Sequence, residues 1–95
     1  MNDYPYQYQL EWQGIKLAIR YNPDWLGIGF TAHIEVMAEE PLPITNTGYR
    51  SIFLNPGIVE RHGGAVAYVT AFLEEEAAKP AWKQVQASRR QLALF

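Results

Sequence analysis

The fold is decided by residues 4–21, which read YPYQYQLEWQGIKLAIRY. Large apolar residues occupy every second position on both sides of Gln13-Gly14, and a period of two is typical of strands with one buried face. Glycine at position 14 suits a tight turn, because it adopts positive φ without a steric penalty. The stretch therefore predicts a β-hairpin with a two-residue loop.

One register of this hairpin gives favourable side-chain pairs on both faces of the predicted sheet. On one face it places Glu11 opposite Lys16, which is a favourable cross-strand charge pair. A slip of one residue would turn every side chain to the other face and destroy this agreement. The other face is apolar in every pair: Trp12 with Ile15, Leu10 with Leu17, Tyr8 with Ile19, and Tyr6 with Tyr21.

The chain after the hairpin predicts a third strand and then an irregular crossing. Apolar and polar residues alternate again over residues 30–36, after the turn-forming residues 22–25. Two prolines in residues 39–43 exclude a central strand there. We expect residues 42–53 to cross in an extended or irregular form, with a short edge strand as the alternative. The free edge of this sheet is open either to dimerisation or to cover by the crossing.

Helical signals fill the carboxyl-terminal half. Asn55-Pro56 places an N-cap residue before a proline at the first helical position, which predicts a short turn over residues 58–61. Apolar spacing predicts the main helix from residue 64 or 65 to 78, and Pro80 separates it from a further helix over 81–90. Strands followed by helices predict an α+β fold, with a three-stranded antiparallel meander and two or three helices packed on one face.

Length and composition bound the class of protein. The 95 residues suit one domain, which we expect over residues 1–90, with residues 91–95 as a tail. With a net charge of −2, the chain lacks the overall positive charge with which proteins bind a phosphate backbone. The absence of cysteine excludes disulfides and thiolate metal sites. Neither a signal peptide nor a bilayer-spanning apolar run is present, so we expect a cytoplasmic protein. We also expect no cofactor.

The two histidines do not indicate a catalytic or metal site. His33 projects from the same strand face as Glu35, and we interpret that face as solvated. His62 precedes a predicted helix start and suits a helix end. Ser51 can be paired on paper with His62 and Glu60, but the local signatures of an activated serine are absent. We therefore predict no enzymatic activity and no metal site.

The polar loop 45–51 is a candidate nucleic-acid contact. It joins the ring of Tyr49 to the guanidinium of Arg50, a set that can stack on a base and contact a phosphate. Lys16 and Arg20 on the exposed sheet face complete this candidate site. The interpretation that we favour is that Tyr49 and Arg50 anchor the crossing, with Arg50 paired to a carboxylate, because one arginine gives little affinity at cellular salt.

Two segments of this region also resemble small uncharacterised proteins of bacterial plasmids and related mobile elements. The segments are Leu42-Pro43-Ile44-Thr45 and Gly48-Tyr49-Arg50-Ser51. The resemblance covers about the central third of the chain. It implies a bacterial mobile-element setting and brings no known activity.

The last five residues read QLALF and carry a more specific signal. Large apolar residues at a chain end are unexpected, since termini are commonly frayed and polar. The pentapeptide resembles the motif with which bacterial replication and repair proteins bind the DNA sliding clamp. That motif is typically glutamine, leucine, a small or acidic residue, leucine and phenylalanine.

This resemblance implies a role for each residue of the tail. Gln91 would form a hydrogen bond at the rim of the clamp's cleft, and Leu92 would contact the surface there. Leu94 and Phe95 would fill the apolar pocket. Ala93 stands where the family usually has serine or aspartate, which puts one polar contact in doubt.

Arg89 and Arg90 just upstream would add electrostatic steering toward an acidic clamp surface. The competing interpretation is that the tail folds back onto the core, with Leu92 and Val85 on one helix face. The sequence thus predicts a non-enzymatic accessory protein that docks on the bacterial sliding clamp. The alternatives are a small nucleic-acid-binding domain of plasmid or mobile-element origin, and a protein whose tail only completes its core.

Overall fold

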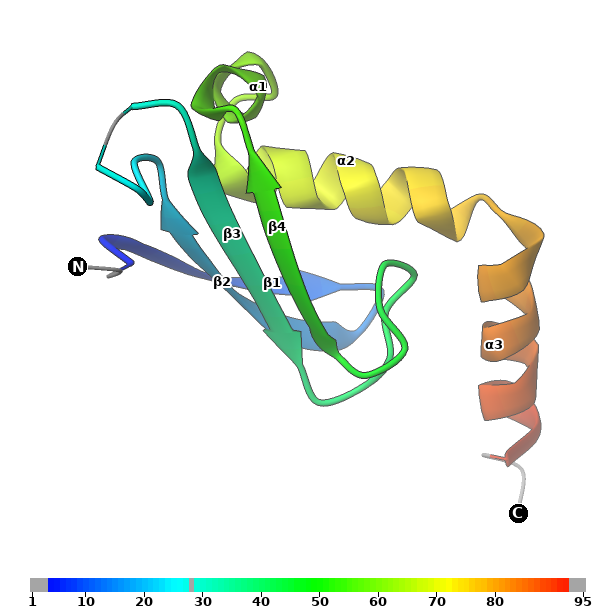
Figure 1. Cartoon of the computed structure of the whole chain (residues 1–95). Coiled ribbons are helices and arrows are strands. Elements are labelled where there is room, and N and C mark those ends of the chain that lie inside the picture. Colours follow the sequence, from blue (N-terminus) through cyan, green and yellow to red (C-terminus); the bar gives the residue numbers. More distant parts are fainter. Residues whose placement is uncertain (1–3, 28, 93–95) are drawn as a thin grey trace.

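A computed structural model of the chain describes residues 4–27 and 29–92, and their side chains through Ser88. Within these residues the chain forms strands first and helices second, so the α+β prediction is confirmed (Figure 1). The strands are β1 (Tyr6–Trp12), β2 (Ile15–Asn22), β3 (Ala32–Ala38) and β4 (Tyr49–Leu54). The helices are α1 (Pro56–Arg61), α2 (Ala65–Ala77) and α3 (Pro80–Leu92).

The β1–β2 hairpin has the predicted register. Trp12 lies opposite Ile15, and Glu11 lies opposite Lys16. The loop residues Gln13 and Gly14 have φ values of 48° and 80°. Positive φ at both loop positions is what a type I′ turn requires, and this turn matches the natural twist of the two strands.

The prediction of a three-stranded sheet was wrong, because the described residues form a sheet of four strands in the order β1-β2-β3-β4. β4 pairs antiparallel with β3, from Met37 opposite Tyr49 to Ala32 opposite Leu54. The two prolines lie in the connection before β4, where they cost the sheet no ladder hydrogen bond. The short edge strand that was the alternative interpretation is therefore the one that forms.

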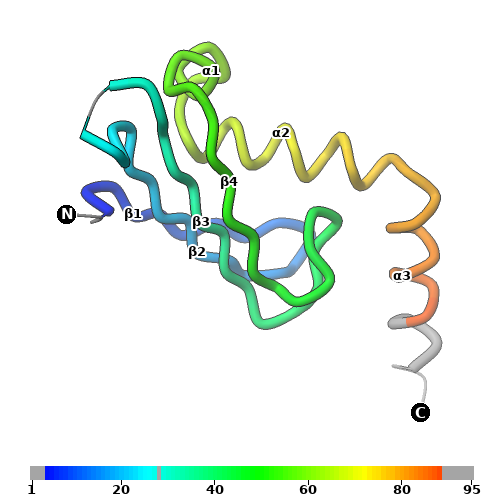
Figure 2. The backbone as a smooth tube through the Cα atoms, in the orientation of Figure 1, coloured from blue at the N-terminus to red at the C-terminus, as the bar shows by residue number. Residues whose placement is uncertain are grey.

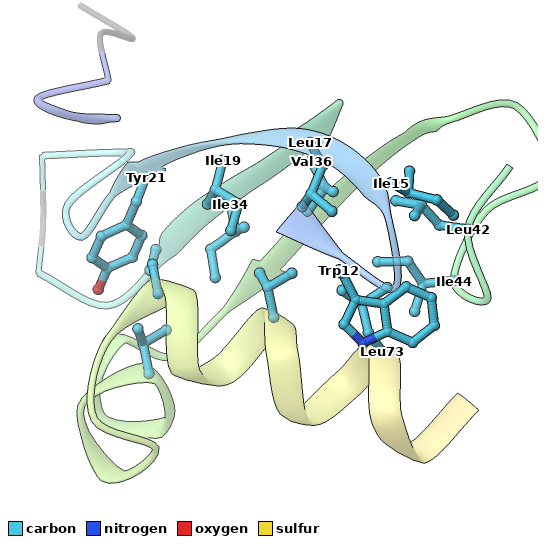
Figure 3. Packing of buried hydrophobic residues seen from close by; sticks show 14 of the residues in the cluster. Trp12, Ile15, Leu17, Ile19, Tyr21, Ile34, Val36, Leu42, Ile44 and Leu73 are labelled. Atoms are coloured by element: carbon cyan, nitrogen blue, oxygen red, sulfur yellow. The ribbon is translucent and has the colours of Figure 1, made fainter. Parts of the chain in front are cut away.

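The core lies between one face of the sheet and helix α2. Ile19, Ile34 and Val36 are fully buried on the sheet, and Leu73 is fully buried on α2 (Figure 3). Val69 of α2 is fully buried as well. Burial of each such side chain stabilises the fold by about 1.5–3 kcal/mol relative to exposure. The 39–48 connection also contributes two buried residues, Leu42 and Ile44.

Two tryptophans close the core at the end of the hairpin. The rings of Trp12 and Trp82 lie 5.9 Å apart between centroids. Trp12 Nε1 donates a hydrogen bond of 2.9 Å to Glu74 Oε1 on α2. Trp82 belongs to the first turn of α3 and is only 5% exposed. The start of α3 is therefore part of the folded body.

The second turn of α3 still touches this body, because Val85 packs against the core and Gln86 bonds to the hairpin turn. The helix then continues to Leu92. Figures 1 and 2 show α3 beyond the end of α2, to the side of the sheet and running crosswise to α2, and the molecule measures 51 Å along its longest axis against 22 and 17 Å across. The helix was predicted over residues 81–90 and runs instead over Pro80–Leu92. It therefore includes Gln91 and Leu92, the first two residues of the predicted tail. We call residues 83–92 the α3 arm.

Candidate functional site

The sheet face that α2 does not cover, here called the open face, carries a cluster centred on His33. The strand register places His33 between Asn22 of β2 and Phe53 of β4. His33 Nε2 lies 2.5 Å from Ser51 Oγ, and Nδ1 lies 3.0 Å from the Tyr4 hydroxyl oxygen. Both ring nitrogens of His33 are thus occupied by hydroxyl groups of this chain.

Aromatic rings enclose the same histidine. Phe53 stacks on the imidazole with a centroid distance of 4.2 Å and an interplanar angle of 4°, and Trp25 meets it edge-on at 4.3 Å. His33 is only 4% exposed, so the interpretation of this face as solvated is corrected here. Burial among these rings lowers the pKa of His33, and the nearby Glu35 opposes this shift only in part.

Glu35 forms a second polar centre beside His33. Its Oε2 accepts a hydrogen bond of 2.7 Å from the Tyr49 hydroxyl and a longer one of 3.5 Å from Tyr4. The hydrogen bond to Glu35 raises the pKa of Tyr49. Burial, followed by the charge of Glu35, raises the pKa of Tyr4. Arg20 pairs with Glu35 at 3.5 Å, a separation that contributes little at a partly exposed site.

Acidification is expected to lower the free energy of unfolding through His33. Its folded-state pKa lies below the unfolded value of 6.5. The unfolded chain therefore binds the proton first, so stability is present above that value and is lost as the pH falls below it. Urea titrations at about pH 7.5 and about pH 5.5 should show this loss in the wild type and in a His62→Gln control. An equal loss in His33→Gln would place the titrating group elsewhere.

The Ser51–His33 contact has the composition of a nucleophile and a base, yet its setting differs from that of a catalytic pair. The second nitrogen of His33 faces the Tyr4 hydroxyl rather than a carboxylate that would orient the imidazole. Ser51 lies within a regular strand and not on the strained turn that exposes a nucleophile. The contact links β3 to β4 across the open face.

The pairing of Ser51 with His62 and Glu60 is not formed. His62 caps the carboxyl end of α1, and its Nδ1 lies 2.9 Å from the carbonyl oxygen of Ile58. Its ring meets Tyr68 edge-on at 5.1 Å. The role near a helix end that the sequence indicated for His62 is confirmed.

The four residues of the candidate nucleic-acid site do not form one surface. Lys16, Arg20 and Tyr49 lie on the open face, whereas the register of β4 turns Arg50 to the face that packs on α2. Glu35 accepts a hydrogen bond from the Tyr49 hydroxyl and pairs with Arg20, so it offsets the positive charge of Arg20. The geometry does not favour a nucleic-acid interface here.

Arg50 anchors the 39–48 connection, as the favoured interpretation held. Its Nη1 donates a hydrogen bond of 2.9 Å to the carbonyl oxygen of Ile44, and its guanidinium lies 5.6 Å from the ring centroid of Phe72. The expected carboxylate partner is corrected to a backbone carbonyl and an aromatic face. Ile44 is buried, and so the anchor holds a buried part of the connection.

The residues of the candidate clamp-binding site lie in or beyond the α3 arm. Arg89, Arg90, Gln91 and Leu92 continue the backbone of α3, and their side chains are not described. Leu94 and Phe95 lie outside the described residues. The arm is attached to the body by Trp82 in the first turn of α3. A hydrogen bond of 3.0 Å from Gln86 Nε2 to Gln13 Oε1 adds a contact to the hairpin turn.

Sequence reasoning missed three aromatic members of the open-face cluster, namely Tyr4, Trp25 and Phe53. The signal for Phe53 was present, because Ser51 and Phe53 alternate with the apolar Ile52 and Leu54 once β4 is accepted as a strand. Tyr4 and Trp25 lie outside the strands, and their approach to His33 depends on how the loops close. No local pattern indicates such a contact.

Two kinds of feature are lacking from the part of the chain that the structure describes. No helix there has the length and apolar character needed to cross a membrane. In the same residues, no three side chains of the metal-binding types gather at one point.

Comparison with known proteins shows the family of the chain. No curated protein and no solved structure matches the chain. The sequence profile described as the KlcB third domain matches residues 5–82. The match spans all four strands, α1, α2 and the first turn of α3 through the buried Trp82. The chain belongs to the KlcB third domain family.

Proposed function

We propose that this chain is a non-enzymatic accessory protein that docks on a bacterial DNA sliding clamp through Gln91–Phe95. The observation that carries the proposal is that α3 continues to Leu92, ten residues past the buried Trp82. Arg89 and Arg90 on the α3 arm would add steering toward an acidic surface.

The composition of the core supports the proposal. The buried apolar residues, among those whose side chains are described, extend from Trp12 to Trp82. Val85, one turn further along α3, is only partly buried. From Trp82 to Leu92 the helix rises by about 15 Å, at about 1.5 Å per residue. A tail that completes the core would have to return over this length.

Docking as an extended peptide requires a small rearrangement. Gln91 and Leu92 form the end of α3, and they would have to leave the helix to enter a cleft. The final turn of a helix opens at little cost in free energy. The ordering of a short peptide does oppose binding, so we expect a dissociation constant on the order of micromolar.

The family match supports a separate role for the arm. It ends at residue 82, so the α3 arm and the tail lie beyond the part that the family fold accounts for. KlcB is a plasmid-associated family, which supports a plasmid or mobile-element origin for this chain. A cytoplasmic location and a role in DNA replication or repair belong to the same proposal.

The proposal is tested by titrating a bacterial sliding clamp against the full chain. The Leu94→Ala, Phe95→Ala double variant should bind at least about tenfold more weakly, because burial of each apolar side chain is worth about 1.5–3 kcal/mol. Isothermal titration calorimetry or fluorescence anisotropy gives the two dissociation constants.

A matched control is available in the loop between β2 and β3. Leu26 and Phe30 are 59% and 72% exposed, so the Leu26→Ala, Phe30→Ala double variant removes the same two residue types elsewhere. This control should bind like the wild type, and Ala93→Asp should bind more tightly because it restores the usual motif. Equal binding by the wild type and the tail variant would remove the motif from consideration.

A further inference from the structure

β1 is an edge strand, and the hairpin turn determines which of its backbone groups point outward. A two-residue turn makes Trp12 and Ile15 the closing hydrogen-bonded pair. Hydrogen-bonded and non-hydrogen-bonded pairs alternate along an antiparallel ladder. The even-numbered residues of β1 therefore bond to β2. The backbone N–H and C=O groups of Gln7, Gln9 and Glu11 point away from the sheet.

The other edge of the sheet is occupied at both ends by its own chain. The Tyr49 carbonyl oxygen accepts a hydrogen bond of 2.7 Å from Thr45 Oγ1, and the Tyr49 N–H donates to Thr47 Oγ1. The carbonyl oxygen of Asn55, just after β4, accepts from the N–H of Ile58. Between these contacts, only a short stretch of the β4 backbone is left to pair with another strand.

Among the residues that the structure describes, none makes such a protective contact with β1, and the strand itself carries few features that prevent pairing. It contains no proline, no lysine and no bulge, and Glu11 is its only charged residue. Tyr6 and Tyr8 flank the edge on the helix side of the sheet, yet they remain 49% and 37% exposed. An added strand would cover apolar surface and satisfy backbone groups at once.

The outward-pointing residues of β1 are all odd-numbered, and this makes the strand complementary to a second copy of itself. New hydrogen-bonded pairs can form only between outward-pointing residues, so an antiparallel partner must place odd residues opposite odd residues. In the register centred on Gln9, Gln9 lies opposite Gln9 of the second copy and Gln7 lies opposite Glu11. Every outward-pointing residue of β1 then forms hydrogen bonds. Centring on Tyr8 or Leu10 engages fewer of them.

The side chains agree with the same register. No like charges meet, because Glu11 faces the neutral Gln7 of the second copy. On the helix side every pair is apolar: Tyr8 opposite Leu10, and Tyr6 opposite Trp12. A shift that placed Glu11 opposite itself would bring two carboxylates together.

We propose that two copies of this chain pair through their β1 strands, antiparallel and in the register centred on Gln9. The two sheets then form one continuous sheet across a two-fold axis. Since isologous pairing of this kind buries the same patch on both subunits, it closes on itself as a dimer. This proposal does not involve the tail, so it stands or falls independently of clamp docking.

Sedimentation equilibrium of the full chain measures the dimer directly. Gln9→Pro removes the N–H groups at the two-fold axis without touching the even-numbered positions that bond to β2. Because two hydrogen bonds are lost in each dimer, dimerisation should weaken at least about tenfold. Gln9→Thr keeps the N–H group at the same position and should dimerise like the wild type. A wild type that stays monomeric at all concentrations would overturn the proposal.

Cysteine cross-linking tests the register even if the Gln9→Pro variant does not fold. The natural chain has no cysteine, so a single substitution gives one thiol. Paired residues in such a ladder have Cα atoms about 5.5 Å apart, within the range that a disulfide spans. Gln9→Cys should form a disulfide-linked dimer under mild oxidation, whereas Gln7→Cys, which faces Glu11, should not. Equal cross-linking of both variants, or of neither, contradicts the register.

Discussion

The Gly48→Ala variant is expected to lose about 3 kcal/mol of the free energy of unfolding, because two unfavourable effects add at this position. Gly48 has a φ of 83°, a left-handed conformation that costs a residue with a Cβ about 1–2 kcal/mol. A Cβ there would also collide with the backbone carbonyl oxygen of Ala38. That backbone cannot easily move away, since Ala38 N donates a hydrogen bond of 2.7 Å to the Gly48 carbonyl oxygen.

Gly29 provides the matched control for this prediction. It has a φ of 77°, but a Cβ at this position would meet no atom within 4 Å. Gly29→Ala should therefore lose only the conformational part, about 1 kcal/mol. Urea denaturation followed by circular dichroism gives both values. Equal losses in the two variants would show that the contact between Gly48 and Ala38 does not constrain the start of β4.

The second large effect is expected from Leu73→Ala in helix α2. Leu73 is fully buried and lies on the side of α2 that faces the sheet (Figure 3). Truncation of a buried leucine removes apolar contacts and leaves a cavity, at a cost of about 2–5 kcal/mol. The same denaturation assay should show this loss.

Leu26→Ala separates this effect from the loss of a leucine in general. Leu26 is 59% exposed, and its truncation should change the free energy of unfolding by less than about 0.5 kcal/mol. A Leu73→Ala variant as stable as Leu26→Ala would contradict the placement of α2 over the sheet.

The parts of the fold with a regular period could be predicted from the sequence. The β1–β2 hairpin has large apolar residues at alternate positions and one glycine turn, so a single register satisfies both faces. Helix α2 was predicted almost to its ends, because its apolar stripe and the following proline are local signals. In both elements, the signals that predict the structure lie within or next to the residues of the element itself.

β4 is different, because its formation depends on the rest of the molecule. The segment follows two prolines and a glycine, and its exposed Tyr49 and Phe53 do not look like one face of a core strand. It becomes a strand because Gly48 turns the chain back along β3. The partners of Arg50 were missed for the same reason, since Ile44 and Phe72 approach it only in the folded state.

The open-face cluster shows the same limit for a candidate site. That His33 and Glu35 share a face followed from their spacing in one strand. The burial of His33 did not, because Tyr4 and Trp25 reach it from outside the strands. Spacing within an element predicts which side chains share a face, whereas contacts between loops and sheets require the fold.

Hydrogen–deuterium exchange of the full chain, with and without an excess of bacterial sliding clamp, tests the central claim most directly. Because the tail is proposed to dock while the folded body stays outside the interface, protection should appear in peptides that cover residues 89–95. Exchange in peptides from β3 and β4 should remain unchanged. Protection of the open-face strands with no change in the tail, or no protection anywhere at saturating clamp, would contradict the account.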